Sequence, residues 1–272
     1  MVFLDSPVGF SRLLKKASLV GAFFVSACWL PFSHALCPAP AALPSARVER
    51  VVDGDTLRLV DGRSVRMIGL NAPETGKKGQ TAEPFAEAAK RRLQSLVDAS
   101  DGEVLLRVGV QDKDHYGRTL ANVYGRDGAN LEAQLLAEGL GYMIAIAPNT
   151  TLVECQQAAE RSARSTAQGL WRNPPVRAAN AIATGGFALV SGKVSDVQRN
   201  RGGVWLSLGS ALVVRIAPEQ LGLFSDVQLT ALKGRQVEVR GWVIDRSRKG
   251  GLRSGQQRWM LPITHPAMLL TR

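Results

Sequence analysis

Acidic residues, cysteines and long apolar runs are scarce in this sequence. Each scarcity excludes some classes of protein. Acidic residues are outnumbered, with 23 Asp and Glu against 34 Lys and Arg, so the net charge at pH 7 is +11. There are three cysteines, which allow one intramolecular disulfide at most. The apolar run Ala17–Leu30 is shorter than the ~20 residues that a membrane-spanning helix needs. With 45% hydrophobic residues the composition does not resemble that of a disordered chain, and 272 residues can bury two modest cores.

Residues 1–35 have the pattern of an export signal. Three basic residues precede the apolar run: Arg12, Lys15 and Lys16. After the run, Ser33-His34-Ala35 places small residues where a signal peptidase reads. No stable membrane span is expected, although an uncleaved anchor is the alternative interpretation. Val25-Ser26-Ala27-Cys28 also resembles a lipoprotein cleavage box, which would leave Cys28 as a lipidated N-terminus.

Cleavage after Ala35 would remove Cys28 and leave Cys37 and Cys155. An even number of cysteines in an oxidising compartment favours a Cys37–Cys155 disulfide. Two inert buried thiols are the alternative. We therefore expect a periplasmic or secreted protein that acts as a monomer.

Charge and composition divide the rest of the chain. Residues 180–272 contain 13 Lys and Arg and five Asp and Glu, a net charge of +8, whereas residues 36–179 are close to neutral. The range 173–186 is rich in Pro, Ala and Gly and has linker composition. The predicted domains are 36–172 and a basic domain at 187–272. Such a basic excess favours binding to polyanions, although charge that serves solubility is the alternative.

Residues 52–75 combine acidic groups, arginines and turn signals at a density found nowhere else in the chain. Asp53-Gly54-Asp55 predicts a tight turn, and Asp61-Gly62 predicts a two-residue hairpin loop, after which Arg66 returns across from the strand that Asp55 opens. Oxygen atoms of Asp55 and Asn71 suit a hard cation such as Ca²⁺. Arg66 adds a planar donor fork that matches phosphate. Solvated turns are the alternative interpretation of both Asp-Gly pairs.

Helical spacing predicts a surface helix at Thr81–Val97, with Phe85 on its apolar face. Thr151 and Glu154 form a capping-box pattern for a helix that extends to about Gln168. Trp171 is expected to pack in the core. Beyond Phe187, five short strands with a helical insert before the fourth suggest a second OB-like barrel. Its tryptophans and basic residues are candidates for a platform that binds single strands, and core packing is the alternative for the tryptophans. These residues are Trp205, Trp242 and Trp259 with Arg199, Arg201, Arg246, Arg248, Lys249 and Arg258.

Three ordered motifs carry a resemblance to a known family. They are Val52-Asp53-Gly54-Asp55-Thr56, then Arg66 with Asn71-Ala72-Pro73-Glu74-Thr75, and then Asp114-His115-Tyr116-Gly117-Arg118-Thr119-Leu120-Ala121. In order and spacing they resemble the staphylococcal nuclease (thermonuclease) family over about Ala46–Trp171. The chain would then be an exported bacterial homologue with an extra C-terminal domain. The resemblance implies a mainly β, α+β fold, in which a five-stranded OB-fold barrel with flanking helices precedes the second small OB-like domain.

The resemblance also implies a role for each matching residue. Asp55, Asn71 and the Ala72 carbonyl would hold Ca²⁺, with Asp53 behind them. Glu74 would orient or deprotonate the attacking water, while Arg66 and Arg118 would grip the phosphate. Tyr116 and His115 would contact the substrate.

This sequence departs from the family pattern at three places. Asn71 replaces an aspartate, which predicts weaker metal binding because ligand charge tunes affinity. Ile144 and Ile146 replace two tyrosines that are expected to stack on a base, while Tyr116 remains. His115 replaces a lysine and so removes a fixed positive charge near neutral pH.

The leading functional hypothesis is an exported, metal-dependent endonuclease that hydrolyses DNA and RNA without strong sugar specificity. The rival is a non-catalytic nucleic-acid or polyanion-binding envelope protein on the same fold. Glu74 favours the first hypothesis, because a pure binder has no need of a carboxylate where phosphate must lie.

Overall fold

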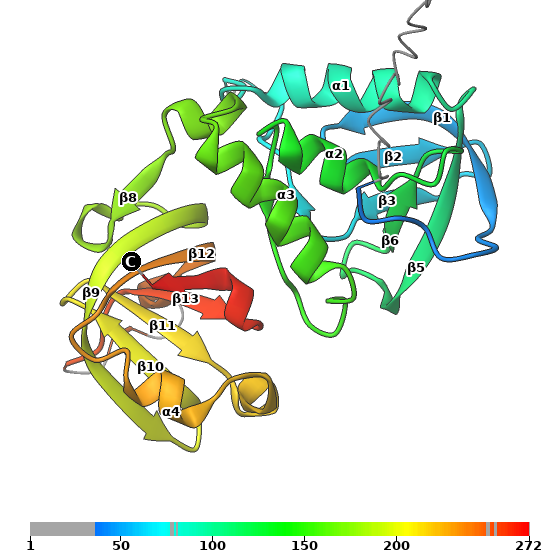
Figure 1. Cartoon of the computed structure of the whole chain (residues 1–272). Coiled ribbons are helices and arrows are strands. Elements are labelled where there is room, and N and C mark those ends of the chain that lie inside the picture. Colours follow the sequence, from blue (N-terminus) through cyan, green and yellow to red (C-terminus); the bar gives the residue numbers. More distant parts are fainter. Residues whose placement is uncertain (1–35, 77–78, 80, 249–250, 253–254, 272) are drawn as a thin grey trace, which may run out of the picture. The chain divides into compact units, whose positions relative to one another are not determined.

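The computed structural model describes residues 36–271 apart from 77–78, 80, 249–250 and 253–254, and it contains two β-barrels (Figure 1). The predicted export signal at 1–35, with Cys28, lies outside the described residues. Within those residues, no helix has both the length and the apolar character needed to cross a bilayer.

The first barrel closes through five strands in the order β1-β2-β3-β6-β5. All neighbours are antiparallel except β3 and β6. Alternate residues of β2 and β3 point inward, so that Leu57, Val65 and Met67 are buried. The strands are β1 (Ser45–Asp53), β2 (Thr56–Leu59), β3 (Ser64–Met67), β5 (Glu103–Lys113) and β6 (Thr119–Tyr124). A separate two-stranded sheet pairs β4 (Leu70–Asn71) with β7 (Tyr142–Met143).

The hairpin between β2 and β3 holds Arg66 opposite Thr56, as the turn signals predict. Its loop differs from the prediction. The Leu59 amide donates to the Arg63 carbonyl, so three residues rather than two lie in the loop. Gly62 takes φ +87°, which suits the left-handed position of a three-residue loop.

Three α-helices belong to the first barrel: α1 (Ala86–Asp98), α2 (Leu131–Ala137) and α3 (Val153–Ser165), followed by the 3₁₀ turn η1 (Gly169–Arg172). Two expectations about their starts are wrong. Phe85 is not on the apolar face of α1, because it precedes the helix with φ 68° and is 41% exposed. Thr151 does not cap α3, which begins after Leu152 without a side-chain cap. Trp171 is buried, which confirms the prediction that it packs in the core.

The second barrel has the same strand order as the first. Its strands β9, β10, β11, β13 and β12 pair in that order, and β12 returns to β9 to close the ring. The third and fifth strands, β11 and β13, are again the parallel pair. These strands are β9 (Gly186–Asn200), β10 (Gly203–Leu208), β11 (Leu212–Ile216), β12 (Gln236–Asp245) and β13 (Trp259–Ile263). The predicted second OB-like barrel is thereby confirmed.

Shorter elements complete the second barrel. A 3₁₀ turn and a helix fill the predicted insert before the fourth strand: η3 (Pro218–Leu223) and α4 (Asp226–Thr230). Two short strands extend the sheet: β8 (Val176–Ala178), which lies in the predicted linker range, and β14 (Leu269–Thr271). The remaining 3₁₀ turns are η2 (Ala179–Ala181), η4 (Arg246–Arg248) and η5 (Pro266–Met268).

A buried ion pair joins α3 to β12. Arg240 on β12 is 1% exposed and donates to both carboxylate oxygens of Glu160 on α3, each at 2.7 Å, and to the Met143 carbonyl at 3.0 Å. Arg164 on α3 contacts Glu238 on β12. These charges connect the two barrels, and the described residues form one compact unit.

Candidate active site

The turn between β1 and β2 positions Asp55 over the first barrel. The Asp55 amide donates to the Asp53 Oδ1 at 3.1 Å, and the Asp55 Oδ2 accepts from the Ala72 amide at 2.8 Å. Gly54 permits this close approach, because a Cβ there would lie 2.6 Å from the Ala72 Cβ and 2.7 Å from the Ala89 Cβ. The predicted ligands Asp55 and Ala72, which are 17 residues apart, therefore meet directly.

Arg66 lies between the two oxygen donors that the sequence predicts as metal ligands. Its Nη2 is 3.0 Å from the Asp55 Oδ2 and 3.2 Å from the Asn71 Oδ1. Its Nη1 donates to the carbonyls of Met67 and Leu70 at 3.0 and 2.7 Å. The Arg66 guanidinium therefore contacts both the backbone turn after β3 and the Asp55 carboxylate. Its role is not limited to the predicted binding of phosphate.

Burial raises the pKa of Asp55 to about 6, although the nearby Arg66 guanidinium lowers it. The neighbouring charge of Asp53 raises the pKa further. A buried carboxylate with a raised pKa lacks sufficient compensating positive charge. The surroundings of Asp55 therefore favour the neutral form of its carboxyl group.

The oxygen atoms around Arg66 are of the type that binds a hard cation, but together they carry little negative charge. The Asp55 carboxylate and Asn71 amide oxygens already converge on one cationic nitrogen, Nη2 of Arg66. Among the described residues, no cluster of three or more His, Cys, Asp or Glu has the arrangement of a metal site. Oxygen ligands suit Ca²⁺, and the low ligand charge predicts modest affinity.

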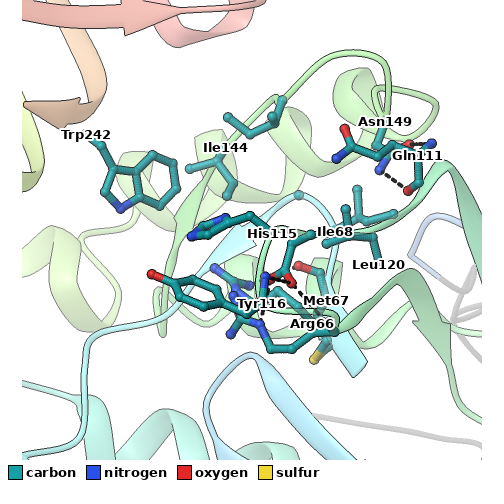
Figure 2. Close-up of a pocket in the computed structure, with 14 residues that line it drawn as sticks. Arg66, Met67, Ile68, Gln111, His115, Tyr116, Leu120, Ile144, Asn149 and Trp242 are labelled. Atoms are coloured by element: carbon teal, nitrogen blue, oxygen red, sulfur yellow. Dashed lines mark hydrogen bonds and ion pairs between the residues drawn. The ribbon is translucent and has the colours of Figure 1, made fainter. Parts of the chain in front are cut away.

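A pocket of about 550 Å³ opens beside this cluster (Figure 2). Both predicted phosphate-binding arginines, Arg66 and Arg118, line it. The Arg118 Nε donates to the Asp114 Oδ2 at 2.7 Å, which leaves its two Nη atoms without a hydrogen-bond partner among the residues that the structure describes. Arg118 can therefore offer two donors to a ligand in the pocket.

Aromatic and aliphatic side chains form another part of the wall, beside the polar Gln111 and Asn149. The rings of His115 and Tyr116 lie 3.7 Å apart between centroids, and Tyr116 is 74% exposed. Ile144 and Ile146, which stand at the positions of the expected tyrosines, also line the pocket. Together these four side chains form one aromatic and aliphatic part of the pocket wall.

Trp242 is a pocket residue that sequence reasoning placed elsewhere. It comes from β12 of the second barrel, yet it lines the same pocket as Arg66 and Arg118. Its indole is 40% exposed and packs edge-on against Phe187 at 5.2 Å. Figure 2 shows it near the rings of His115 and Tyr116. Only the packing of the barrels could reveal this placement, because no local motif links residue 242 to the nuclease motifs.

Glu74, like the proposed ligands Asp55, Asn71 and Ala72, is a predicted site residue that does not line the pocket. It is exposed, two residues beyond Ala72, and is absent from the pocket lining. Its amide donates to the Glu83 Oε2 at 2.9 Å, and its carbonyl accepts from the Glu83 amide at 3.0 Å. The backbone of Glu74 is therefore anchored while its carboxylate faces solvent.

The two cysteines expected to pair do form a disulfide. Cys37 and Cys155 are joined, with their Cα atoms 5.7 Å apart. The bond ties the segment before β1 to α3, across 118 residues of chain.

Comparison with known proteins places the chain in a family. Residues 64–173 match the family described as staphylococcal nuclease homologue, and this range includes Arg66, Asn71, Glu74 and Arg118. Thermonuclease of Staphylococcus hyicus is 35% identical over 135 residues, which are 47% of this chain and 75% of that protein.

Two relatives from Bacillus subtilis (strain 168) are longer than the matched part. Endonuclease YncB is 33% identical over 134 residues, and SPbeta prophage-derived endonuclease YokF is 34% identical over 134 residues. The chain spans 62% and 44% of their lengths, respectively, and each match covers 47% of this chain. The family match ends before the second barrel begins. On the thermonuclease match and the family match together, the chain belongs to the staphylococcal nuclease family.

Proposed function

We propose that this protein is an exported, metal-dependent endonuclease that hydrolyses phosphodiester bonds of DNA and RNA. The observation that carries the proposal is one pocket lined by both Arg66 and Arg118 beside the Asp55–Asn71 oxygen pair. The names of the relatives, thermonuclease and endonuclease, agree with it.

The two pocket arginines and Glu74, whose solvent-facing carboxylate lies outside the pocket lining, divide the work of phosphodiester hydrolysis. Arg118 donates its free Nη–H groups to the phosphate oxygens, and Arg66 adds positive charge as negative charge develops on the oxygens around phosphorus. Glu74 takes the proton of a water whose oxygen bonds to phosphorus while the bond to the leaving oxygen breaks. Ca²⁺, held by Asp55, Asn71 and the Ala72 carbonyl with Asp53 behind, would supply further charge neutralisation at the phosphate.

A base of the substrate stacks on Trp242, and Tyr116 lines the same pocket. Both aromatic side chains are substantially exposed, and the isoleucines at 144 and 146 cannot provide this contact. Stacking on an aromatic side chain contributes about 1–3 kcal/mol per base and tolerates any base. Weak sugar and sequence specificity follow, because no hydrogen-bonding readout is required.

The disulfide and the N-terminal pattern support activity outside the cytoplasm. The bonded Cys37 and Cys155 suit an oxidising compartment. Fractionation should place the mature chain in the periplasm or medium with no titratable thiol, whereas labelling of Cys28 with a lipid precursor would show the lipoprotein alternative. Free thiols in the exported protein would contradict the proposal.

The decisive experiment is degradation of plasmid DNA and of RNA with Ca²⁺ and with a chelator. Glu74→Gln should lower the cleavage rate by about 10²- to 10⁴-fold without loss of fold, because only proton acceptance changes. Glu87→Gln removes another exposed carboxylate, on α1, and should not change the rate. Equal rates for wild type and Glu74→Gln would remove Glu74 from the mechanism. Binding without any cleavage by the wild type would favour the non-catalytic alternative.

Trp242→Ala tests the base contact. The KM should rise about 5- to 150-fold with a smaller change in kcat, and Trp242→Phe should restore most of the affinity. An unchanged KM for Trp242→Ala would show that the indole does not touch substrate.

A further inference from the structure

The second barrel carries arginines at the places where the first barrel carries its phosphate-binding arginines. Arg66 is the penultimate residue of β3, the third strand of the first barrel, and Arg215 is the penultimate residue of β11, the third strand of the second. Arg118 directly precedes β6, and Arg258 directly precedes β13, the fifth strand in each barrel. Because both barrels share one strand order, these residues lie at equivalent places in the fold.

Trp205 is the centre of this region. It lies on β10 directly opposite Arg215 and is only half-buried. The guanidinium carbons of Arg215 and Arg246 lie 5.4 and 5.6 Å from the centre of its indole ring. The indole Nε1 donates to the Asn200 Oδ1 at 3.0 Å, which holds the ring in place. Cations beside an exposed tryptophan form a surface on which bases stack and phosphates are neutralised.

Ion pairing distinguishes Arg215 and Arg246 from other arginines of the second barrel. Arg199 is paired with Asp226, and Arg258 is paired with Asp245. Arg215 donates to the Gly202 carbonyl, and Arg246 donates to the Gln257 carbonyl. Among the described residues, neither Arg215 nor Arg246 has a carboxylate partner. Their positive charge is therefore available to an external anion.

The loops around Trp205 add charge but lack the catalytic groups. The loop between β9 and β10 is Arg201-Gly202, where the first barrel has the acidic turn that includes Asp55. The loop between β12 and β13 contains Arg246 and Arg248. Without a carboxylate in the first of these loops, the equivalent of the proposed metal site is missing.

From these placements we infer that the second barrel holds a non-catalytic binding site for single-stranded nucleic acid, centred on Trp205, Arg215 and Arg246. OB-folds bind oligonucleotides on the second and third strands and on the loops that follow the first and fourth strands. Trp205 lies on the second strand, Arg215 on the third, and Arg246 in the loop after the fourth. A single strand is favoured over a duplex because the indole needs an unstacked base as its partner.

The test measures binding of a fluorescent oligothymidylate to the full chain carrying Glu74→Gln, in chelator, over a range of salt concentrations. Arg215→Gln with Arg246→Gln removes two unpaired charges, and Arg199→Gln with Arg235→Gln removes two exposed charges elsewhere on the same barrel. The first pair should weaken binding at least tenfold and reduce the slope of log K against log salt by about 1.4, at ~0.7 per phosphate contact. The control pair should leave the affinity and the salt slope nearly unchanged.

Trp205→Ala should weaken binding about 5- to 150-fold, and Trp205→Phe should recover most of the loss. Hydrolysis of a small nitrophenyl phosphodiester by otherwise wild-type protein should be unaffected by any of these changes, because that substrate fits in the active-site pocket. Equal effects of the two arginine pairs would overturn the inference and indicate a diffuse charge effect. Loss of small-substrate hydrolysis, with melting temperature unchanged, would also overturn it by placing these residues in the catalytic pocket.

Discussion

We expect substitution of Arg240 to lower the free energy of unfolding of the whole molecule more than substitution of any other residue. The Arg240 side chain is 1% exposed and Glu160 is 2% exposed, so neither charge can turn to solvent. Arg240→Met removes two 2.7 Å contacts to the carboxylate, while the Met143 amide still donates to it at 2.8 Å. The nearest remaining cation, the Arg164 Nε, is 3.7 Å from Glu160.

The expected cost follows from the uncompensated carboxylate. Removing one partner of a buried ion pair typically costs about 3–5 kcal/mol, a large share of the ~5–15 kcal/mol by which domains are stable. Urea unfolding at pH 7, followed by tryptophan fluorescence, should show a loss of that size for Arg240→Met. The double variant Glu160→Gln with Arg240→Met should recover much of it, because the amide oxygen still accepts from Met143 and the Glu160 charge is gone, while Glu238 keeps its ion pair with Arg164.

Arg199→Met is the matched control, because Arg199 is also paired with a carboxylate but lies exposed on the same barrel. It should leave the urea midpoint nearly unchanged. If Arg240→Met costs no more than Arg199→Met, the ion pair does not hold the barrels together. The same reasoning predicts that a chain ending after Val176 is destabilised, because it too leaves Glu160 unpaired.

Three further predictions concern charge and covalent constraint. Asn71→Asp should lower the Ca²⁺ concentration for half-maximal cleavage, and for half the calcium-induced rise in melting temperature, by about tenfold if the added carboxylate is worth ~1.4 kcal/mol; no shift in either titration would show that residue 71 does not face the metal. Replacing Cys37 and Cys155 by alanine should lower the free energy of unfolding by about 2–5 kcal/mol, since the bond spans 118 residues, and an unchanged urea midpoint would contradict this. Burial raises the pKa of Glu132 from 4.5 to about 8, so folding takes up a proton between those values and stability falls as pH rises through that window. Glu132→Gln should flatten this dependence in urea titrations at pH 5, 6, 7 and 8, and an unaltered slope would assign the effect to other groups.

Local sequence determined the strands and the motifs of both barrels. Alternating apolar residues and turn signals are properties of neighbouring residues, so the five strands of the second barrel and the helical insert before its fourth strand could be predicted. Helix starts were harder, because the capping pattern at Thr151 competes with the backbone that actually begins α3 after Leu152. The Asp61-Gly62 signal located a turn, but not the length of its loop.

The tertiary structure alone decided which distant groups share a site. The sequence could place Asp55, Asn71 and Arg66 together because one hairpin and one short segment connect them. It could not place Trp242 in their pocket, since 176 residues separate it from Arg66 and the contact depends on how the two barrels pack. Folding also decides which arginines of the second barrel are neutralised, because it brings carboxylates near some of them. Asp226 meets Arg199 across 27 residues, while Arg215 meets an indole. Periodicity reports the face on which a side chain lies, but the partner on that face is set by packing between elements.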